Sequence, residues 1–209
     1  MAHLDPLDRA RLGALDRHFH ERYDETIGFT PNSLLTMARR PEIVTALGDL
    51  ITTIWRTGTV PAGLKALVGL VSSTSAGCRY CQAHEAVDAR AHGVPDEKVA
   101  AVWSFEESPL YDDAERAALR FARYAGLVPN AVTAEHFAEL REHFDEGEIV
   151  ELLATIGLFG FLNRWNDSVA TSLEPEPSGY ANARLAPSGW EPGKHGRSEE
   201  RRVGKECRL

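Results

Sequence analysis

Apolar residues recur every three or four positions through most of residues 5–172, and this spacing constrains the fold more than any other feature of the sequence. After Pro41, for example, one helical stripe contains Ile43, Val44, Leu47, Leu50, Ile51, Ile54 and Trp55. No stretch alternates apolar and polar residues between hairpin turns, as the strands of an antiparallel sheet would. We therefore predict an all-α fold of about eight helices.

Glycine, proline and capping residues divide the pattern into separate helices. The predicted helices cover residues 5–27, 32–39, 41–57, 62–75, 78–92, 95–105, 112–125, 133–144 and 149–172. The valine- and serine-rich end of 62–75 would also suit a buried strand. The helix from Ile149 is the most apolar, so we expect it at the centre of the fold or in a subunit interface. Its polar cluster, residues 163–167, either lines a pocket mouth or provides only an ion pair between Arg164 and Asp167.

The composition changes after Glu174, where proline, glycine, serine, asparagine and alanine dominate the following segment. We predict an all-α domain at residues 1–174 and an irregular C-terminal arm at residues 175–196. Arg197–Cys207, with the sequence RSEERRVGKEC, resembles the in-frame translation of a common sequencing adapter. We therefore predict that residues 197–209 are a non-native tail, with an ordinary basic tail as the alternative.

The charge and hydropathy of the sequence exclude several classes of partner. The net charge is −8 and the isoelectric point is about 5.5, so we expect binding neither to nucleic acid nor to an anionic membrane. Residues 1–13 contain no apolar signal segment. The longest apolar stretch, residues 149–162, is shorter than the roughly 20 residues that span a bilayer. We therefore expect a cytoplasmic protein.

The segment Gly77–His92, GCRYCQAHEAVDARAH, combines a C-x-x-C pair with an alanine-rich helix. Cys78 and Cys81 at this spacing fall within disulfide reach on one helical face, and the positive end of the helix dipole stabilises a thiolate there. Arg79 adds positive charge beside them. Because the chain has only three cysteines, this pair is more typical of a catalytic or metal-binding site than of a disulfide-stapled scaffold.

His84 follows Cys81 by three residues and is a candidate proton acceptor beside the thiol. A zinc site requires four ligands, whereas C-x-x-C-x-x-H supplies three on one helix, so we expect no metal and no cofactor. Glu85, four residues after Cys81, is a second candidate for proton transfer, although a carboxylate there would raise the thiol pKa. Asp88 and His92 are predicted on the exposed surface of the same helix.

Two segments carry a resemblance to a known family. Leu64–His84, LKALVGLVSSTSAGCRYCQAH, and Phe161–Asp167, FLNRWND, resemble the carboxymuconolactone decarboxylase superfamily and, within it, the AhpD-like, peroxidase-related members. The resemblance extends over about residues 38–194. It implies an AhpD-like helical fold around a helical hairpin. It also implies homo-oligomers, commonly trimers or hexamers, with active sites near subunit contacts.

The same resemblance implies a thiol-dependent peroxidase. In these proteins the second cysteine attacks the hydroperoxide and the first resolves the product, which assigns Cys81 as the peroxidatic residue and Cys78 as the resolving residue. An external dithiol electron donor then reduces the disulfide. The family's proton relay is altered here, because Ala66 occupies the position of its glutamate and Glu85 that of its histidine. His84 lies one residue before the histidine position, so the predicted catalytic set is Cys81, Cys78, His84 and Glu85.

Two alternatives to a peroxidase stay open on the sequence. The first is a non-redox enzyme similar to the lactone decarboxylases of the superfamily, but those members do not rely on a C-x-x-C pair. The second is a non-enzymatic helical oligomer whose dithiol senses the redox state or acts as a structural clip. The missing glutamate at Ala66 keeps this second alternative open.

Overall fold

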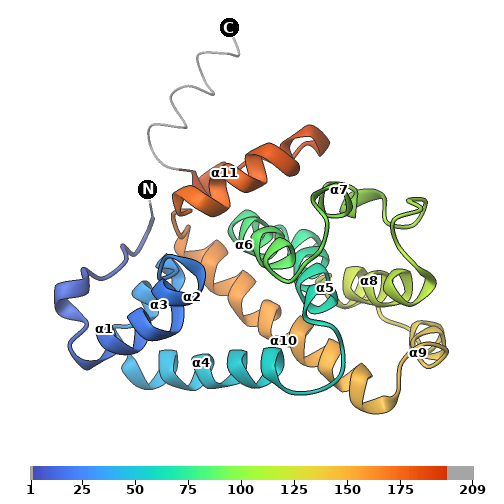
Figure 1. Ribbon diagram of the computed structural model, residues 1–209, viewed down its shortest axis with the longest axis horizontal. Coiled ribbons are helices and arrows are strands. Elements are labelled where there is room, and N and C mark those ends of the chain that lie inside the picture. The colour runs from blue at the N-terminus through green and yellow to red at the C-terminus, as the bar shows by residue number, and fades with distance from the viewer. Residues whose placement is uncertain (1, 197–209) are drawn as a thin grey trace, which may run out of the picture.

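The computed structural model describes residues 2–196, and all regular elements in this range are helices. In Figure 1 the long helix α10 (Glu146–Val169) crosses the middle of the molecule, with the N-terminal helices on one side and the central hairpin on the other. The predicted all-α fold is confirmed. Within residues 2–196, no helix combines the length and the apolar character needed to cross a membrane.

A helical hairpin of α5 (Ala62–Ser75) and α6 (Arg79–Ala91) forms the centre of the larger hydrophobic core. Gly77 has a φ of +77°, which glycine adopts readily and which allows a short turn between the two helices. The backbone N–H of Cys78 closes this turn by donating to the carbonyl oxygen of Ser73 (3.0 Å). The α5 segment is therefore a helix and not the buried strand that its composition also allowed.

Helix α10 lies between two hydrophobic cores. One core surrounds the hairpin and α8 (Asp113–Ala125), and the other holds the N-terminal segments and α4 (Pro41–Arg56) together with Leu158 of α10. Asp145 caps α10 by accepting a hydrogen bond from the N–H of Glu148 (2.8 Å), and this capping box explains where the helix begins. The most apolar helix of the sequence therefore occupies the centre of the fold.

The N-terminal segment differs from the single helix predicted at residues 5–27, so that prediction was wrong. The segment is divided into η1 (Arg9–Arg11), α1 (Ala14–Phe19), the π-helical turn η2 (His20–Asp24) and α2 (Glu25–Ile27). Gly13, with a φ of +57°, interrupts the helix that the apolar spacing suggested. A short helix α3 (Asn32–Met37) follows and leads into α4.

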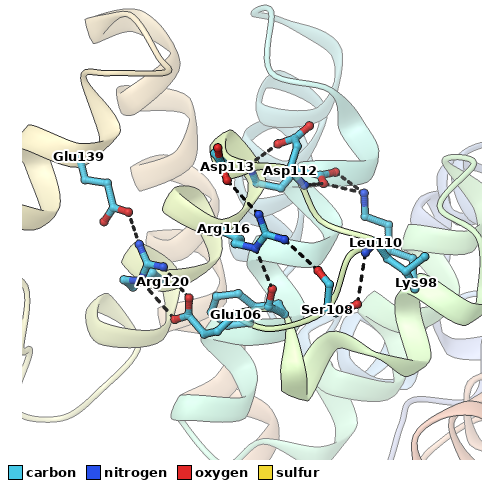
Figure 2. Close-up of polar contacts among 11 residues, drawn as sticks. Lys98, Glu106, Ser108, Leu110, Asp112, Asp113, Arg116, Arg120 and Glu139 are labelled. Carbon is cyan, nitrogen blue, oxygen red and sulfur yellow. Dashed lines mark hydrogen bonds and ion pairs between the residues drawn. The ribbon is translucent and has the colours of Figure 1, made fainter.

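Three short helices lie farther from the centre: α7 (Asp96–Ala100) packs on α6, η3 (Val102–Ser104) packs on α7, and α9 (Ala134–Leu140) packs on α8. Figure 2 shows two arginines of α8 that fix the preceding loop in place. Arg116 donates to two carbonyl oxygens of the loop, at residues 105 and 108 (3.3 and 2.9 Å). Arg120 pairs with both Glu106 and Glu139 and thereby joins the loop to α9.

The arm after Glu174 is more ordered than its composition suggested. It contains α11, which packs along α6, and two 3₁₀ turns; their bounds are Pro175–Arg184 for α11, Ala186–Ser188 for η4 and Gly193–His195 for η5. The residues that this arm contributes to the larger core are Tyr180, Ala181, Leu185 and Trp190. Their spacing among prolines and glycines gives only a weak periodic signal. The predicted non-native tail, residues 197–209, lies outside the described residues.

A buried ion pair joins α10 to α5. The Nζ of Lys65 lies 2.7 Å from Oε2 of Glu151, and the Lys65 side chain is only 2% exposed. Lys65 also donates to the carbonyl oxygens of Ile54 and Thr57 (2.8 and 3.1 Å), so each of its three N–H bonds has an acceptor. Burial would raise the pKa of Glu151, but Lys65 and the neighbouring backbone N–H groups hold it below its usual value. Because each N–H bond of the Lys65 ammonium group has an acceptor, its charge is tolerated in the core.

Replacing Glu151 with alanine should lower the free energy of unfolding by about 3 kcal/mol, because Lys65 would keep a buried charge without this carboxylate. Urea denaturation followed by circular dichroism measures the change. The control is Glu146→Ala, at the exposed first residue of the same helix, which should cost less than about 0.5 kcal/mol. Equal losses in the two variants would show that the ion pair contributes nothing specific.

Candidate functional site

The two cysteines lie at the start of α6, next to the turn of the hairpin. Cys78 is the N-cap residue of α6, and Cys81 occupies its first turn. Their Sγ atoms are 3.3 Å apart, and both thiols are reduced and buried. A small rotation of the side chains is sufficient for a disulfide between residues at this spacing.

The two thiols differ in their electrostatic environment. Cys78 accepts the S–H of Cys81 and the backbone N–H groups at the start of α6, and these hydrogen bonds lower the pKa of the Cys78 thiol against the opposing effect of burial. Burial raises the pKa of the Cys81 thiol and Cys78 raises it further, whereas the amide N–H of Asn166 (3.4 Å) lowers it. Of the two thiols, Cys78 therefore ionises more readily than Cys81.

A cavity of about 850 Å³ opens between α6, α10 and the N-terminal helices, and Cys81 lines it. Cys78 is not among the residues of its wall. About half of the lining residues are aromatic or aliphatic, including Tyr23, Phe29, Trp55, Tyr80, Leu158, Phe159 and Leu162, and charged residues such as Arg22, Arg56 and Asp88 also line it. A cavity of this size and character suits an apolar organic molecule. Access from the cavity therefore favours Cys81, although the hydrogen bonds at the start of α6 favour ionisation of Cys78.

The fold brings His84 to the same cavity but not into contact with a cysteine. The ring nitrogen Nε2 of His84 lies 2.7 Å from Oε2 of Glu174. The ring stacks on Tyr80 with 4.3 Å between centroids, and Phe29 meets it edge-on at 5.8 Å. Within residues 2–196, no hydrogen bond joins His84 to either thiol. Proton exchange between His84 and Cys81 therefore needs a bridging water or substrate.

Glu174 belongs to this site, and the sequence analysis did not identify it. Its carboxylate accepts hydrogen bonds from the Tyr80 hydroxyl (2.8 Å) and from the backbone N–H of Asn32 (2.5 Å), in addition to the contact with His84. Burial alone would raise the pKa of Glu174, but the charge and N–H of His84, with the other two donors, hold it below its usual value. Glu174 is therefore an ionised group inside the protein. Nothing in the local sequence indicates this long-range contact.

Glu85 lies on the buried side of α6, against α5 and α10. Its Oε2 has no hydrogen-bond partner among the described residues. Gly69 provides the space for it, because a side chain there would collide with both Glu85 and Phe159. Burial raises the pKa of Glu85 well above its usual value, and Asp88 raises it further. The sequence suggested a carboxylate near the thiols, whereas burial of Glu85 favours the neutral carboxylic acid.

Of the two residues predicted on the exposed surface of α6, His92 is exposed and Asp88 is half-buried. The indole N–H of Trp55 donates to Asp88 (3.0 Å), and Asp88 also lines the cavity. The hydrogen bond from His92 to Asp88 raises the pKa of His92 to about 9, against the opposing effect of burial. This chain of contacts links α4 to the end of α6. Asp88 therefore belongs to the wall of the cavity, and the exposed His92 pairs with it from outside.

The polar cluster at residues 163–167 is divided between several roles. The predicted ion pair between Arg164 and Asp167 is not formed. Arg164 donates to the carbonyl oxygen one turn earlier in α10, and Asp167 pairs with Lys194 (2.8 Å). Asn166 is the member that reaches Cys81. In the part of the chain that the structure describes, no group of three or more His, Cys, Asp or Glu side chains could hold a metal ion.

Replacing Glu85 with glutamine should stabilise the fold in a pH-dependent way. The folded-state pKa of Glu85 lies above the unfolded value of 4.5, so the fold loses stability as pH rises from about 4.5 toward the folded pKa. The variant should raise Tm by about 2–4 °C or more near pH 8 and by much less near pH 4. Scanning calorimetry at both pH values measures this, with Glu107→Gln at an exposed position as the control. A change in Tm that is the same at both pH values would contradict burial of a neutral acid.

Comparison with known proteins identifies relatives of this chain. Residues 41–124, from the start of α4 to α8, match the model of the carboxymuconolactone decarboxylase family. The uncharacterized protein YdfG of Bacillus subtilis (strain 168) is 30% identical over 101 residues, which cover 48% of this chain and 67% of YdfG. The uncharacterized protein YnjA of Escherichia coli (strain K12) is 32% identical over 92 residues, or 44% of this chain and 50% of YnjA.

Two solved structures resemble the chain over most of their length. A variant of the debrominase Bmp8 in complex with 2,3,4-tribromopyrrole is 34% identical, with a TM-score of 0.80 over 86% of this chain and 96% of Bmp8. An AhpD-core, peroxidase-related protein from Ralstonia eutropha JMP134 is 22% identical, with a TM-score of 0.73 over 83% of this chain and 94% of that protein. The second likeness bears on the fold alone. The chain belongs to the carboxymuconolactone decarboxylase family.

Proposed function

We propose that this chain is a dithiol oxidoreductase that reduces an organic hydroperoxide while Cys78 and Cys81 are oxidised to a disulfide. The observation that carries the proposal is the pair of reduced thiols, 3.3 Å apart, with Cys81 in the wall of an apolar cavity of about 850 Å³. This cavity is larger than hydrogen peroxide needs. An apolar or aromatic hydroperoxide fits its lining better.

The first step begins with a proton transfer between the two thiols. Cys81 passes its proton across the 3.3 Å contact to Cys78 and becomes the thiolate that lines the cavity. The Cys81 thiolate attacks the terminal oxygen of ROOH, the O–O bond breaks, and Cys81 becomes a sulfenic acid as RO⁻ leaves. Asn166 stabilises the Cys81 thiolate through its amide N–H. RO⁻ takes a proton from the cavity wall, for which His84 and Glu85 are the two candidate donors.

The second step closes the disulfide. The thiol of Cys78 attacks Sγ of Cys81, its proton leaves with the sulfenic hydroxyl as water, and the two sulfurs are joined. Overall, ROOH, one proton and the Cys78 thiolate–Cys81 thiol pair become ROH, water and a disulfide. An external dithiol must then return two electrons by thiol–disulfide exchange. A cytoplasmic location, where dithiol reductants are present, suits this cycle.

Reductive dehalogenation is the second candidate, and the likeness to Bmp8 favours it. Bmp8 is described as a debrominase and is 34% identical over 96% of its length. The same dithiol could supply the two electrons that replace a carbon–bromine bond by carbon–hydrogen, with release of bromide and closure of the disulfide. The aromatic wall of the cavity, including Phe29, Trp55 and Phe159, suits a flat ring as well as it suits an aromatic hydroperoxide.

The exposed face of α10 favours contact with a second copy of the chain. The exposed face of α10 carries apolar side chains at helical spacing: Val150, Leu153 and Phe161. A groove of about 880 Å³ follows the same face, and Gly157 and Gly160 provide room for close approach of another helix. We propose that a second copy of the chain covers this face, as expected for a trimer or hexamer of the family.

Replacing Cys81 with serine should abolish reduction of cumene hydroperoxide with dithiothreitol as the electron donor. Replacing Cys78 with serine should slow this oxidation, because Cys81 loses its proton acceptor, and should stop disulfide formation, because the sulfenic acid has no resolving thiol in the chain. Both variants are made in a background with serine at position 207. Peroxide consumption and bromide release from 2,3,4-tribromopyrrole are measured in parallel. Consumption of neither substrate by the wild type would contradict both functions.

Replacing Phe161 with glutamate should reduce the oligomer to smaller species, because it places a charge on the proposed contact face. Light scattering after size-exclusion chromatography measures the mass. The control is Leu110→Glu, at another exposed apolar side chain in the loop before α8, and it should leave the mass unchanged. A wild-type monomer, or the same mass for wild type and Phe161→Glu, would contradict this interface.

A further inference from the structure

The carboxylate of Glu174 joins three parts of the chain beside the cavity. Glu174 lies between α10 and α11, outside the residues that match the family model. Its Oε1 accepts the N–H of Asn32 and the hydroxyl of Tyr80, while its Oε2 lies 2.7 Å from Nε2 of His84. The side-chain amide of Asn32 also donates to the carbonyl oxygen of Ser172 (2.9 Å). Donors from α3 and α6 therefore fix the position of this carboxylate.

Helix capping does not explain why the Glu174 carboxylate is buried at this position. Glu174 is the N-cap residue of α11, but its side chain makes no capping hydrogen bond to that helix. The side chain is only 7% exposed, and an ionised carboxylate at such depth is costly unless donors surround it. Tyr80 stays protonated and able to donate, because burial and Glu174 raise its pKa well above the usual value. The whole arrangement therefore keeps a negative charge directed at His84.

The contact with Glu174 determines which atom of His84 is available to the cavity. A carboxylate accepts hydrogen bonds, so Nε2 of His84 carries a proton and donates it to Glu174. The ring cannot turn freely, because it stacks on Tyr80 and meets Phe29 at its edge. The second nitrogen, Nδ1, makes no hydrogen bond to the protein among the described residues. His84 is 17% exposed and lines the cavity with Cys81.

We propose that Glu174 is a positioning residue that holds His84 as the acid for the leaving group of the reduction. The inference rests on the proposed function. When Cys81 breaks the O–O bond, RO⁻ takes the Nδ1 proton of the His84 imidazolium and becomes ROH. The neutral ring keeps its Nε2 proton on Glu174 and regains the Nδ1 proton from solvent. Glu85 also lines the cavity but is more deeply buried than His84, and it is not the donor in this scheme.

The test compares two peroxides whose leaving groups differ in basicity. tert-Butyl hydroperoxide releases a strongly basic alkoxide that needs a proton, whereas peracetic acid releases acetate, which does not. In Glu174→Gln, oxidation of the dithiol by tert-butyl hydroperoxide should be roughly 10- to 100-fold slower, while oxidation by peracetic acid should change by less than about threefold. His84→Gln should give the same pattern. Stopped-flow tryptophan fluorescence measures both rates under single-turnover conditions.

Two further variants separate positioning from structure. Glu174→Asp keeps the charge and should recover part of the rate with tert-butyl hydroperoxide. Glu107→Gln, at an exposed glutamate in the loop before α8, should change neither rate. Equal slowing with both peroxides in Glu174→Gln would mean that Glu174 only maintains the fold, and this would overturn the inference. Unchanged rates with both peroxides would also overturn it.

A spectroscopic measurement decides the question even if catalysis is absent. In wild-type protein labelled with ¹⁵N-histidine, near pH 8, His84 should show the Nε2–H tautomer and a low-field Nε2 proton bound to Glu174. Both features should disappear in Glu174→Gln. If the wild type reduces neither peroxide, the proposed function fails, but loss of this signature still supports the positioning of His84. An Nδ1–H tautomer in the wild type would overturn the inference without any variant.

Discussion

The chemistry proposed for this protein depends on the 3.3 Å contact between the Sγ atoms of Cys78 and Cys81. The contact follows from the backbone, because Gly77 turns the chain sharply and makes Cys78 the N-cap of α6, one helical turn from Cys81. Cys78 receives the N–H groups of the helix start, while Cys81 faces the cavity. Cys78 ionises more readily, but Cys81 is the thiol that lines the cavity. Transfer of a proton from Cys81 to Cys78 places the thiolate on the accessible sulfur.

Two ionisable side chains, Lys65 and Glu85, are buried in the core but differ in their hydrogen bonds. Lys65 has an acceptor for each N–H bond, including Glu151, and therefore acts as a structural fastener between helices. Glu85 is also buried, but its Oε2 lacks a partner among the described residues, and burial keeps it neutral. A protein retains such an unsatisfied acid at a cost in stability, which is common where a group takes part in function.

The sequence predicted the helices from strong apolar spacing and the dithiol from the C-x-x-C pair, since both depend on local periodicity. The N-terminal helix was predicted as continuous because apolar spacing outweighed Gly13, whose positive φ breaks it. Glu174 could not be recognised, because its partners Asn32 and His84 lie far away in the chain and only the tertiary fold brings them together. The buried, neutral state of Glu85 likewise depends on packing against α5 and α10, which no local pattern records.

The identity of the attacking thiol is tested most directly by trapping the sulfenic acid. Cys78→Ser protein, with serine also at position 207, is mixed with one equivalent of cumene hydroperoxide in the presence of dimedone, and the labelled peptide is identified by mass spectrometry. We expect the dimedone adduct on Cys81, because Cys81 lines the cavity. The reciprocal Cys81→Ser protein should remain unlabelled. An adduct on Cys78 in that variant, with none on Cys81 in the first, would contradict the assignment and make Cys78 the nucleophile.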